Sequence, residues 1–276
     1  MTQQDVARGV TSALLAPDPP PESRHGPIAQ LLIAWSPLSL ILVAYGVAGW
    51  ITAPLEGDLA DGANRLGVGL HVAGPADGDR SLFGAIPTVW LQQRLVDGTT
   101  HWYDAVAALV YSTHFVAIPL VTAAAWFWLR DRFTGWIIAV LAFTVVGVSG
   151  YVAYPAAPPW MASEYGAIGG VTRISDIGWE WLHLDLIGTL TTSGQSGSNP
   201  VAAMPSLHAG SALLVALFLW PVAGNRWRGA LAAYVLLMAI TLVYTGEHYV
   251  VDVIAGWLTA GGAMAVGVMV RAQGST

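Results

Sequence analysis

Residues 204–222 read MPSLHAGSALLVALFLWPV, a polar start that contains proline followed by a long apolar run. An apolar run of this kind can cross the hydrocarbon core of a membrane, which is about 30 Å thick and needs roughly 20 residues in helix. Proline at the first helical position is preorganised for a helix start, so we expect Ser206 and His208 in the first turn. The stretch therefore predicts a membrane helix whose first turn carries a histidine.

The composition of the whole chain is also typical of a membrane protein. Of its 276 residues, 55% are hydrophobic and 10% are charged, whereas a soluble domain is about a quarter charged. All eleven basic residues are arginine, and with a formal net charge of -6 they form no basic stripe that would favour nucleic acid. The chain has no cysteine, which excludes disulfides, thiolate nucleophiles and cysteine-ligated metal sites.

We expect an all-α, polytopic membrane protein with six transmembrane helices. The candidate spans are residues 28–52, 103–129, 134–154, 205–222, 229–244 and 248–270, of which 229–244 is the shortest. They define a membrane domain over residues 28–271. It follows a polar, proline-containing segment, residues 1–27, that we expect to be disordered and cytoplasmic. Two long outer segments, 53–102 and 155–204, exceed simple turns and are expected to carry function.

The distribution of arginine predicts the orientation, because basic residues that flank spans are retained on the cytoplasmic side. With the N-terminus inside, the cytoplasmic arginines are Arg8, Arg24, Arg130, Arg132, Arg226, Arg228 and Arg271. Four others, Arg65, Arg80, Arg94 and Arg173, are then outside. We therefore expect a multi-pass protein of the plasma membrane whose spans at 205–222 and 248–270 both begin on the outer face.

The second outer segment contains two recognisable pieces. Residues 179–184 read WEWLHL, which predicts a short interfacial helix because tryptophan prefers the headgroup level. By the same preference, Trp160 and Trp179 are interpreted as interfacial anchors. Residues 191–199 read TTSGQSGSN, and this polar, glycine-rich composition favours a flexible linker.

A second polar motif begins the last apolar span, where residues 245–252 read TGEHYVVD. His248 and Asp252 are four residues apart, so on a helix their side chains lie on one face within contact range. A carboxylate at this distance can fix the imidazole tautomer and stabilise its cationic form. The free amides of a helix start also attract phosphate. A single pair of this kind is usually an ordinary polar contact, but ionisable groups in membrane spans are costly unless they function. The sequence therefore predicts a catalytic set of His208, His248 and Asp252.

At these residues the chain resembles the type 2 phosphatidic acid phosphatase (PAP2) superfamily, and within it the branch that includes inositol phosphorylceramide synthase. Residues 205–210 look like the branch's Pro-Ser-x-His element, and residues 248–252 look like its His-Tyr-x-x-Asp element. Smaller similarities are YPAAPPW at 154–160, LQQRL at 91–95 and YSTHF at 111–115. The resemblance covers residues 87–256 and implies a PAP2-like core bundle.

The resemblance implies a mechanism in which His248 attacks phosphorus to form a phosphohistidine, Asp252 holds its ring and His208 protonates the leaving oxygen. The substrate would be a lipid phosphate or a phospholipid. With a lipid alcohol as acceptor, the enzyme would transfer a phospho-headgroup such as phosphoinositol between lipids. With water as acceptor, it would be a lipid or prenyl phosphate phosphatase. The motifs require no cofactor and no metal, and they do not indicate the oligomeric state.

A transporter and a non-catalytic membrane scaffold are the alternatives to an enzyme. A transporter would show paired internal repeats or helices broken near the middle of the membrane, and the sequence shows neither clearly. A membrane scaffold would need no convergent set of two histidines and an aspartate. Both are less well supported than lipid phosphate chemistry.

The chain departs from the wider superfamily at its cationic residues. Phosphatases of the superfamily carry a lysine-rich first motif and an arginine six residues before the second histidine, but this chain has no lysine and has Leu242 at that position. Because a phosphoryl transition state concentrates negative charge, other cations must replace them. Arg94 and Arg173 are the candidates, although an arginine in an outer loop is usually a headgroup anchor.

Other polar residues are weaker candidates for substrate binding. Ser206 and Tyr249 belong to the two histidine motifs. His114 is about eleven residues into its span, roughly 16 Å along a helix, too deep to reach the outer face directly. It is either hydrogen-bonded between helices or part of the lining of a headgroup pocket. His101 and Asp104 could bind a polar headgroup, or they could be solvated interfacial residues.

Overall fold

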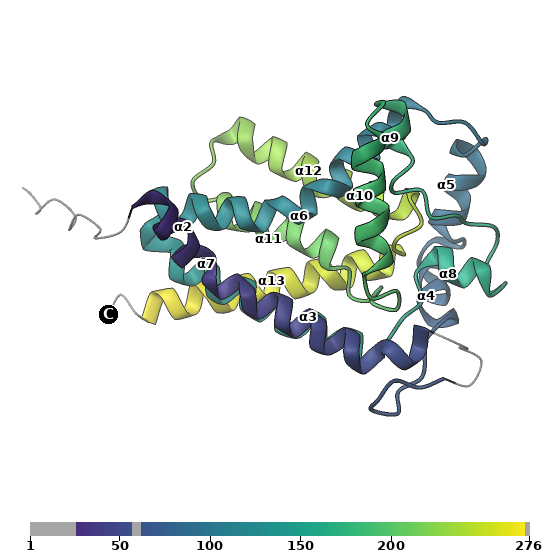
Figure 1. Cartoon of the computed structure of the whole chain (residues 1–276), viewed down its shortest axis with the longest axis horizontal. Helices are drawn as coiled ribbons and strands as arrows, with labels where there is room; N and C mark the ends of the chain where they lie inside the picture. Colours follow the sequence, from purple (N-terminus) through teal and green to yellow (C-terminus); the bar gives the residue numbers. More distant parts are fainter. Residues whose placement is uncertain (1–25, 57–61, 274–276) are drawn as a thin grey trace, which may run out of the picture. The chain divides into compact units, whose positions relative to one another are not determined.

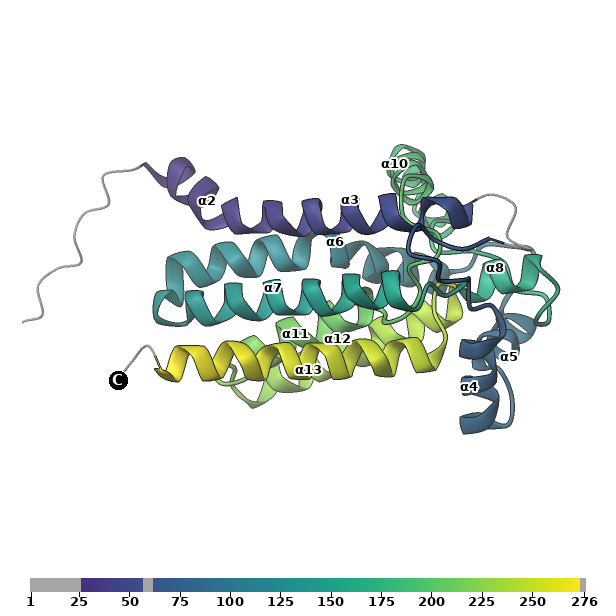
Figure 2. The same cartoon turned by 90° about the horizontal axis from the view of Figure 1, so that it is seen from below.

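The computed structural model describes residues 26–56 and 62–273, and in these ranges the chain is helical, with only isolated β-bridges between short extended segments. The long helices are α6 (Trp102–Trp128), α7 (Arg130–Ala153), α12 (Asn225–Tyr244) and α13 (Val250–Gln273). They pack with the shorter α3 (Ser39–Thr52) and α11 (Leu207–Leu219) into one bundle (Figures 1 and 2). The predicted all-α fold is confirmed.

Five helical stretches of the described chain are long and apolar enough to cross a membrane: Pro27–Leu55, Trp102–Trp128, Arg130–Ala153, Asn225–Tyr244 and Val250–Gln273. The sixth predicted span is the short apolar helix α11, with 13 residues. The expectation that 229–244 would be shortest was wrong, because α12 begins earlier and has 20 residues. α11 is shorter because it starts only after its cap at Ser206 and ends before Pro221, which cannot continue the hydrogen-bond ladder. The protein is an integral membrane protein.

Two compact units divide the chain, Met1–Ile33 and Ala34–Thr276. The first unit is described only from Gly26 and holds the start of α2 (Pro27–Trp35). The predicted disordered segment, residues 1–27, therefore lies almost wholly outside the described residues. The second unit carries the bundle and every feature discussed below.

The two segments predicted to link spans contain short helices of their own. The first connecting segment, residues 53–102, holds η2 (Ala53–Glu56), α4 (Ala73–Phe83) and α5 (Pro87–Leu95). The second, residues 155–204, holds α8 (Pro159–Glu164), α9 (Gly178–Trp181) and α10 (Asp185–Ser196). A further short turn, η1 (Ser36–Leu38), precedes α3. Both connecting segments lie at the end of the bundle where α11 and α13 begin (Figure 1).

Two expectations for the second connecting segment need correction. The predicted short helix near 179–184 is present as α9, but Trp179 is buried and packs against Gly188, so it is a core residue rather than an interfacial anchor. The flexible-linker interpretation of 191–199 was wrong, because α10 continues to Ser196. Contacts outside the helix hold this polar sequence in place, including the Thr192 hydroxyl, which donates to Asp176 at 2.7 Å.

Glycines bring α7, α11 and α13 unusually close together. A Cβ added at Gly256 of α13 would collide with the carbonyl oxygen of Ser206, and one added at Gly210 of α11 would lie 2.8 Å from the oxygen of Gly256. Further along, a Cβ at Gly135 of α7 would lie 2.9 Å from the oxygen of Gly267. Small residues at crossing points are a common means of packing membrane helices. In this bundle they hold the starts of α11 and α13 against each other.

Candidate active site

The start of α11 is capped by Ser206, whose side chain accepts a hydrogen bond from the N–H of Ala209 at 3.2 Å. Pro205 was expected to be the first helical residue, but it precedes the cap. His208 is the second residue of the helix. Ser206 is fully buried and does not line the cavity described below. Its candidate role in substrate binding gives way to capping, which fixes the position of His208.

His248 and Asp252 meet at the start of α13. The Nδ1 atom of His248 lies 3.6 Å from an Asp252 carboxylate oxygen, and both side chains are buried. The same oxygen accepts the N–H of Tyr249 at 2.9 Å. Because α13 begins only at Val250, His248 precedes the helix, and the expected pairing of two residues on one helix face was wrong in detail. The carboxylate instead folds back over the helix start and faces the Nδ1 side of the His248 ring.

The two motif histidines converge. The ring centroids of His208 and His248 are 5.7 Å apart. His208 also stacks on Tyr111 at 4.9 Å and lies 4.0 Å from the ring of His114. His114 is expected to lie too deep to reach the outer face directly, and it meets His208 because that ring also faces α6. Nδ1 of His114 is 2.9 Å from the Ser211 hydroxyl, as expected for a histidine bonded between helices.

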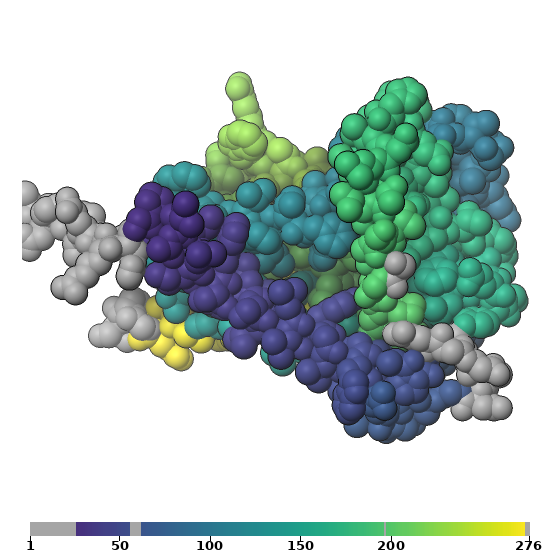
Figure 3. Space-filling model, viewed as in Figure 1, coloured from purple at the N-terminus to yellow at the C-terminus, as the bar shows by residue number. Residues whose placement is uncertain are grey.

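These histidines open onto one large cavity of about 1010 Å³. Most of its wall is apolar and comes from η1, α3, α6 and α7, as shown by Leu38, Ile41, Leu42, Phe115, Ile118, Phe143 and Val148. His114, His208 and His248 also line it, together with Arg173 and Glu247. The surface is hollowed between α3, α6 and α10 (Figure 3). A mostly apolar chamber with a cluster of ionisable groups suits an amphiphile.

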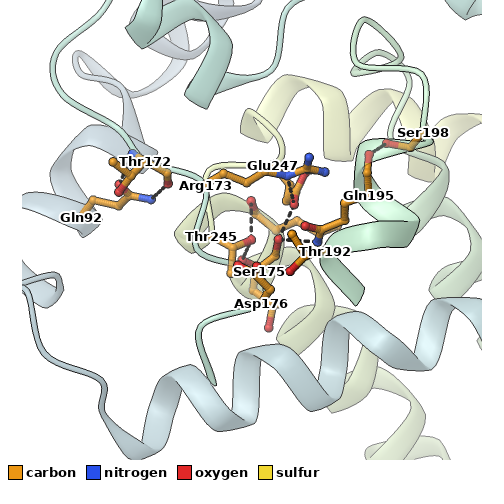
Figure 4. Close-up of polar contacts among 12 residues, drawn as sticks. Gln92, Thr172, Arg173, Ser175, Asp176, Thr192, Gln195, Ser198, Thr245 and Glu247 are labelled. Carbon is orange, nitrogen blue, oxygen red and sulfur yellow. Dashed lines mark hydrogen bonds and ion pairs between the residues drawn. The ribbon is translucent and has the colours of Figure 1, made fainter. Parts of the chain in front are cut away.

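Arg173 is held at this cluster by a bidentate ion pair. Its Nε and Nη2 atoms donate to the two carboxylate oxygens of Glu247 at 2.8 and 3.1 Å (Figure 4). Ser175 donates to the same carboxylate at 2.5 Å, and Gln195 of α10 donates to Ser175 at 2.8 Å. Burial alone would lower the pKa of Arg173, but the Glu247 carboxylate outweighs it and raises that pKa above its ordinary value. The guanidinium therefore stays charged beside His248.

Two predicted substrate-binding residues lie elsewhere. The guanidinium of Arg94 sits over the Trp90 ring at 4.1 Å and donates to the Trp90 carbonyl, so it follows the exposed surface of α5 and does not line the cavity. Tyr249 is fully buried in an apolar cluster with Leu55 and Met161 and is likewise absent from the cavity wall. Neither side chain is placed to touch a substrate in this cavity.

The polar pair at the start of α6 also differs from expectation. Asp104 is buried rather than solvated, and it accepts hydrogen bonds from the N–H of His101 at 2.7 Å and from the Tyr244 hydroxyl at 2.5 Å. His101 in turn caps the helix, so the two residues form a capping box. Their role is to start α6 and to tie it to the end of α12.

Asp79 of α4 is a site residue that the sequence did not reveal. Its carboxylate accepts the N–H groups of Val250 at 3.1 Å and of Val251 at 3.0 Å, which caps the start of α13 from another segment. Burial raises the pKa of Asp79 to about 6, against the opposing effect of these two hydrogen bonds. The sequence did hold one indication of such a residue. His248 and Tyr249 provide no ordinary capping side chain for the first amides of α13, so a cap from another segment is required.

A family comparison agrees with the arrangement of the two histidine motifs. Residues 78–266 match the PAP2 superfamily, and the chain belongs to that superfamily. The matched region begins beside Asp79 and includes all three members of the predicted catalytic set.

The chain is similar to several curated proteins that are named as synthases. The chain is 28% identical over 203 residues to the phosphoinositol dihydroceramide synthase of Bacteroides thetaiotaomicron, which covers 68% of this chain and 64% of the relative. It is 37% identical over 126 residues to an inositol phosphorylceramide synthase catalytic subunit of Schizosaccharomyces pombe, covering 41% of this chain and 28% of the relative. It is 29% identical over 178 residues to the corresponding subunit of Saccharomyces cerevisiae, and this match covers 60% of this chain and 42% of the relative. The matches thus span less than two thirds of these relatives' lengths. No solved structure matches the chain significantly.

Proposed function

We propose that the protein is a membrane lipid phosphotransferase that moves a phospho-headgroup, such as phosphoinositol, from a phospholipid to the hydroxyl of a second lipid. One observation carries the proposal: His208 and His248, with ring centroids 5.7 Å apart, face the same large and mostly apolar cavity, and Asp252 stands behind His248. We infer that the phosphate of a lipid lies against these two imidazoles while its tails occupy the apolar part of the cavity.

In the first half-reaction, Nε2 of His248 attacks the phosphorus of the donor. Asp252 faces Nδ1 and stabilises the positive charge that develops on the ring. The bond between phosphorus and the glycerol oxygen breaks, and His208 donates a proton to that oxygen so that the diacylglycerol leaves as a neutral alcohol. The headgroup phosphate remains on His248 as a phosphohistidine.

In the second half-reaction the acceptor alcohol replaces the diacylglycerol. His208, now neutral, removes the hydroxyl proton while the acceptor oxygen attacks phosphorus, and the phosphorus–nitrogen bond to His248 breaks. The product carries the headgroup phosphate, and both histidines return to their starting states. Splitting the transfer in this way lets one site serve two lipids in turn.

The charge beside the histidines favours a phosphodiester donor. Among the described residues that line the cavity, Arg173 is the sole arginine, and Glu247 already neutralises part of its charge. A phosphodiester carries one negative charge, whereas a phosphomonoester carries nearly two at neutral pH. With so little positive charge available, the monoanion is the better match. The relatives named above, which are by name a phosphoinositol dihydroceramide synthase and an inositol phosphorylceramide synthase subunit, support the same choice.

We also propose that the site faces the outer side of the plasma membrane. The support is the arginine distribution: Arg130, Arg132, Arg226, Arg228 and Arg271 are at the ends of α7, α12 and α13 remote from the histidines. Since the chain has no cysteine, single cysteines at exposed Asp97 and Arg226 test this directly. In intact cells, a membrane-impermeant maleimide should label Asp97→Cys and spare Arg226→Cys, and the reverse pattern would refute the orientation.

Turnover by the purified protein tests the reaction. Phosphatidylinositol, phosphatidic acid and a prenyl phosphate are each offered with and without ceramide as the lipid alcohol. We expect headgroup transfer from phosphatidylinositol that requires ceramide. Release of inorganic phosphate from either monoester, with no transfer, would instead identify a lipid phosphatase that uses water.

A further inference from the structure

Gln92 of α5 is a buried side chain, 4% exposed, whose amide is fully used. Its Nε2 group donates to the carbonyl of Thr172 at 2.8 Å and to the carbonyl of Tyr244 at 2.9 Å. Its Oε1 atom accepts the N–H of Thr172 at 2.9 Å. The side chain therefore joins two segments that are far apart in sequence, and Figure 4 shows it beside Thr172.

Both of these segments lead directly to the cavity. Thr172 is followed by Arg173, and Tyr244 ends α12 just before Glu247 and His248. The segments also contact each other, because the N–H of Ile174 donates to the Thr245 carbonyl at 3.1 Å. Gly246, at a φ of +79°, permits this approach: a Cβ there would lie 2.8 Å from the Thr172 oxygen. The position of Arg173 relative to His248 thus depends on how the two segments are held.

We propose that Gln92 is a positioning residue that sets the relation between the Arg173 guanidinium and the His248 ring. The proposal rests on the proposed phosphotransferase function. Gln92 touches neither substrate nor histidine. It acts by holding the Arg173 segment and the His248 segment at one separation, so that the positive charge meets the phosphate while Nε2 of His248 faces phosphorus. A misplacement of about 1 Å in such a geometry can lower a rate about a hundredfold.

Only an amide meets the demands at this point of the structure. Two carbonyl oxygens must receive donors, and one N–H must find an acceptor, which is the set of groups that a glutamine side chain offers. Glutamate would place a carboxylate against two carbonyl oxygens and could donate to neither. Leucine would leave the buried Tyr244 carbonyl and the partly buried N–H and carbonyl of Thr172 without this partner.

The exposed neighbour Gln93 provides a matched control on the same helix. With full-length protein in lipid nanodiscs and phosphatidylinositol and ceramide as substrates, we expect Gln92→Leu and Gln92→Glu to lower kcat about 10-fold to 100-fold, within the range set by such displacements. KM should change much less, since the apolar cavity is untouched. Gln93→Leu should stay within about twofold of wild type. Unchanged kcat in both Gln92 variants would overturn the proposal.

A double-mutant cycle separates positioning from general destabilisation. If Gln92 acts through Arg173, then Gln92→Leu should cause little further loss once Arg173→Gln is present. Losses that multiply in full would mean that Gln92 acts independently of Arg173, and the proposal would fail.

Hydrogen exchange supplies a readout that needs no turnover. The N–H of Thr172 should exchange faster in Gln92→Leu than in wild type, and at the wild-type rate in Gln93→Leu, because only Gln92 accepts that hydrogen bond. An unchanged exchange rate of the Thr172 N–H would show that Gln92 does not hold this segment. If the wild-type protein transfers no headgroup, the proposed function fails, while this measurement still decides whether Gln92 holds the Arg173 segment.

Discussion

The membrane helices and the connecting segments contribute different things to the site. α11 and the approach to α13 carry the histidines, and glycines such as Gly210 and Gly256 let these helices touch. The connecting segments supply side chains that bond to the backbone near the site: Asp79 accepts from the first amides of α13, and Gln92 joins the Thr172 segment to the end of α12. The two motif histidines therefore belong to the bundle or its edge, whereas Asp79 and Gln92, which hold the neighbouring backbone, belong to the connecting segments.

Removal of either histidine should nearly abolish turnover, but by different routes. His248→Ala loses the nucleophile with every donor. His208→Ala loses a proton donor, worth about 10²-fold to 10⁴-fold, and a donor with a nitrophenol leaving group should recover part of that loss because nitrophenol leaves without protonation. Rates with both donors test this, with the exposed His183→Asn as control. Equal rescue of the two variants would disprove the assignment.

Arg173→Gln should lower kcat about 10²-fold to 10³-fold, as when one donor to a developing anionic charge is removed. It also leaves Glu247 without its bidentate partner. Arg94→Gln should leave turnover close to wild type, since Arg94 only covers Trp90. Steady-state kinetics of Arg173→Gln and Arg94→Gln measure both effects. Both residues belong to connecting segments, but only Arg173 lines the cavity. A larger loss in Arg94→Gln would reverse the assignment of the phosphate cation.

Gly256→Ala tests whether the close crossing of α11 and α13 is needed for stability and activity. A methyl group there would collide with the Ser206 carbonyl, and overpacking of this kind costs about 1 to 3 kcal/mol. We expect a lower thermal unfolding temperature in detergent and lower activity, since α11 and α13 would move apart. Gly261→Ala on the same helix meets no atom within 4 Å and should be neutral. Equal stability of the two variants would show that the close crossing is not needed.

The smallest effect should come from the charge on Asp79. Its pKa rises from 3.8 to about 6 on folding, so the folded protein binds more protons than the unfolded chain between these values. Stability therefore gains from protonation of Asp79 as pH falls, and that contribution is lost as pH rises through about 6. Thermal unfolding of wild type minus Asp79→Asn, followed from pH 7 to pH 5, should show this slope. A flat difference would mean that the Asp79 carboxyl keeps an ordinary pKa.

The sequence indicated the helical bundle and the histidine pair because each signal was local. His208, His248 and Asp252 stand where polar segments meet apolar runs, and burial makes such residues conspicuous. It could not choose between Arg94 and Arg173, because the path of the connecting segments decides which one reaches the cavity. It missed Asp79 and the bonding of Gln92 for the same reason: their partners are 171 and 152 residues away. The sequence left two roles open for His114, a hydrogen bond between helices or a place in the pocket lining, and the side chain meets both descriptions.

The short length of α11 has a consequence for the lipid environment. Thirteen residues rise about 20 Å along a helix, less than the hydrocarbon thickness of about 30 Å, whereas its neighbours α12 and α13 have 20 and 24 residues. The cap of α11 at Ser206 meets α13 beside Gly256, after the first turn of that helix. We therefore expect a donor phosphate to descend from the headgroup level to reach His208. A bilayer of shorter acyl chains reduces that descent. The hydrophobic thickness of the host membrane would then tune the rate, and the enzyme would work fastest in thin regions of membrane.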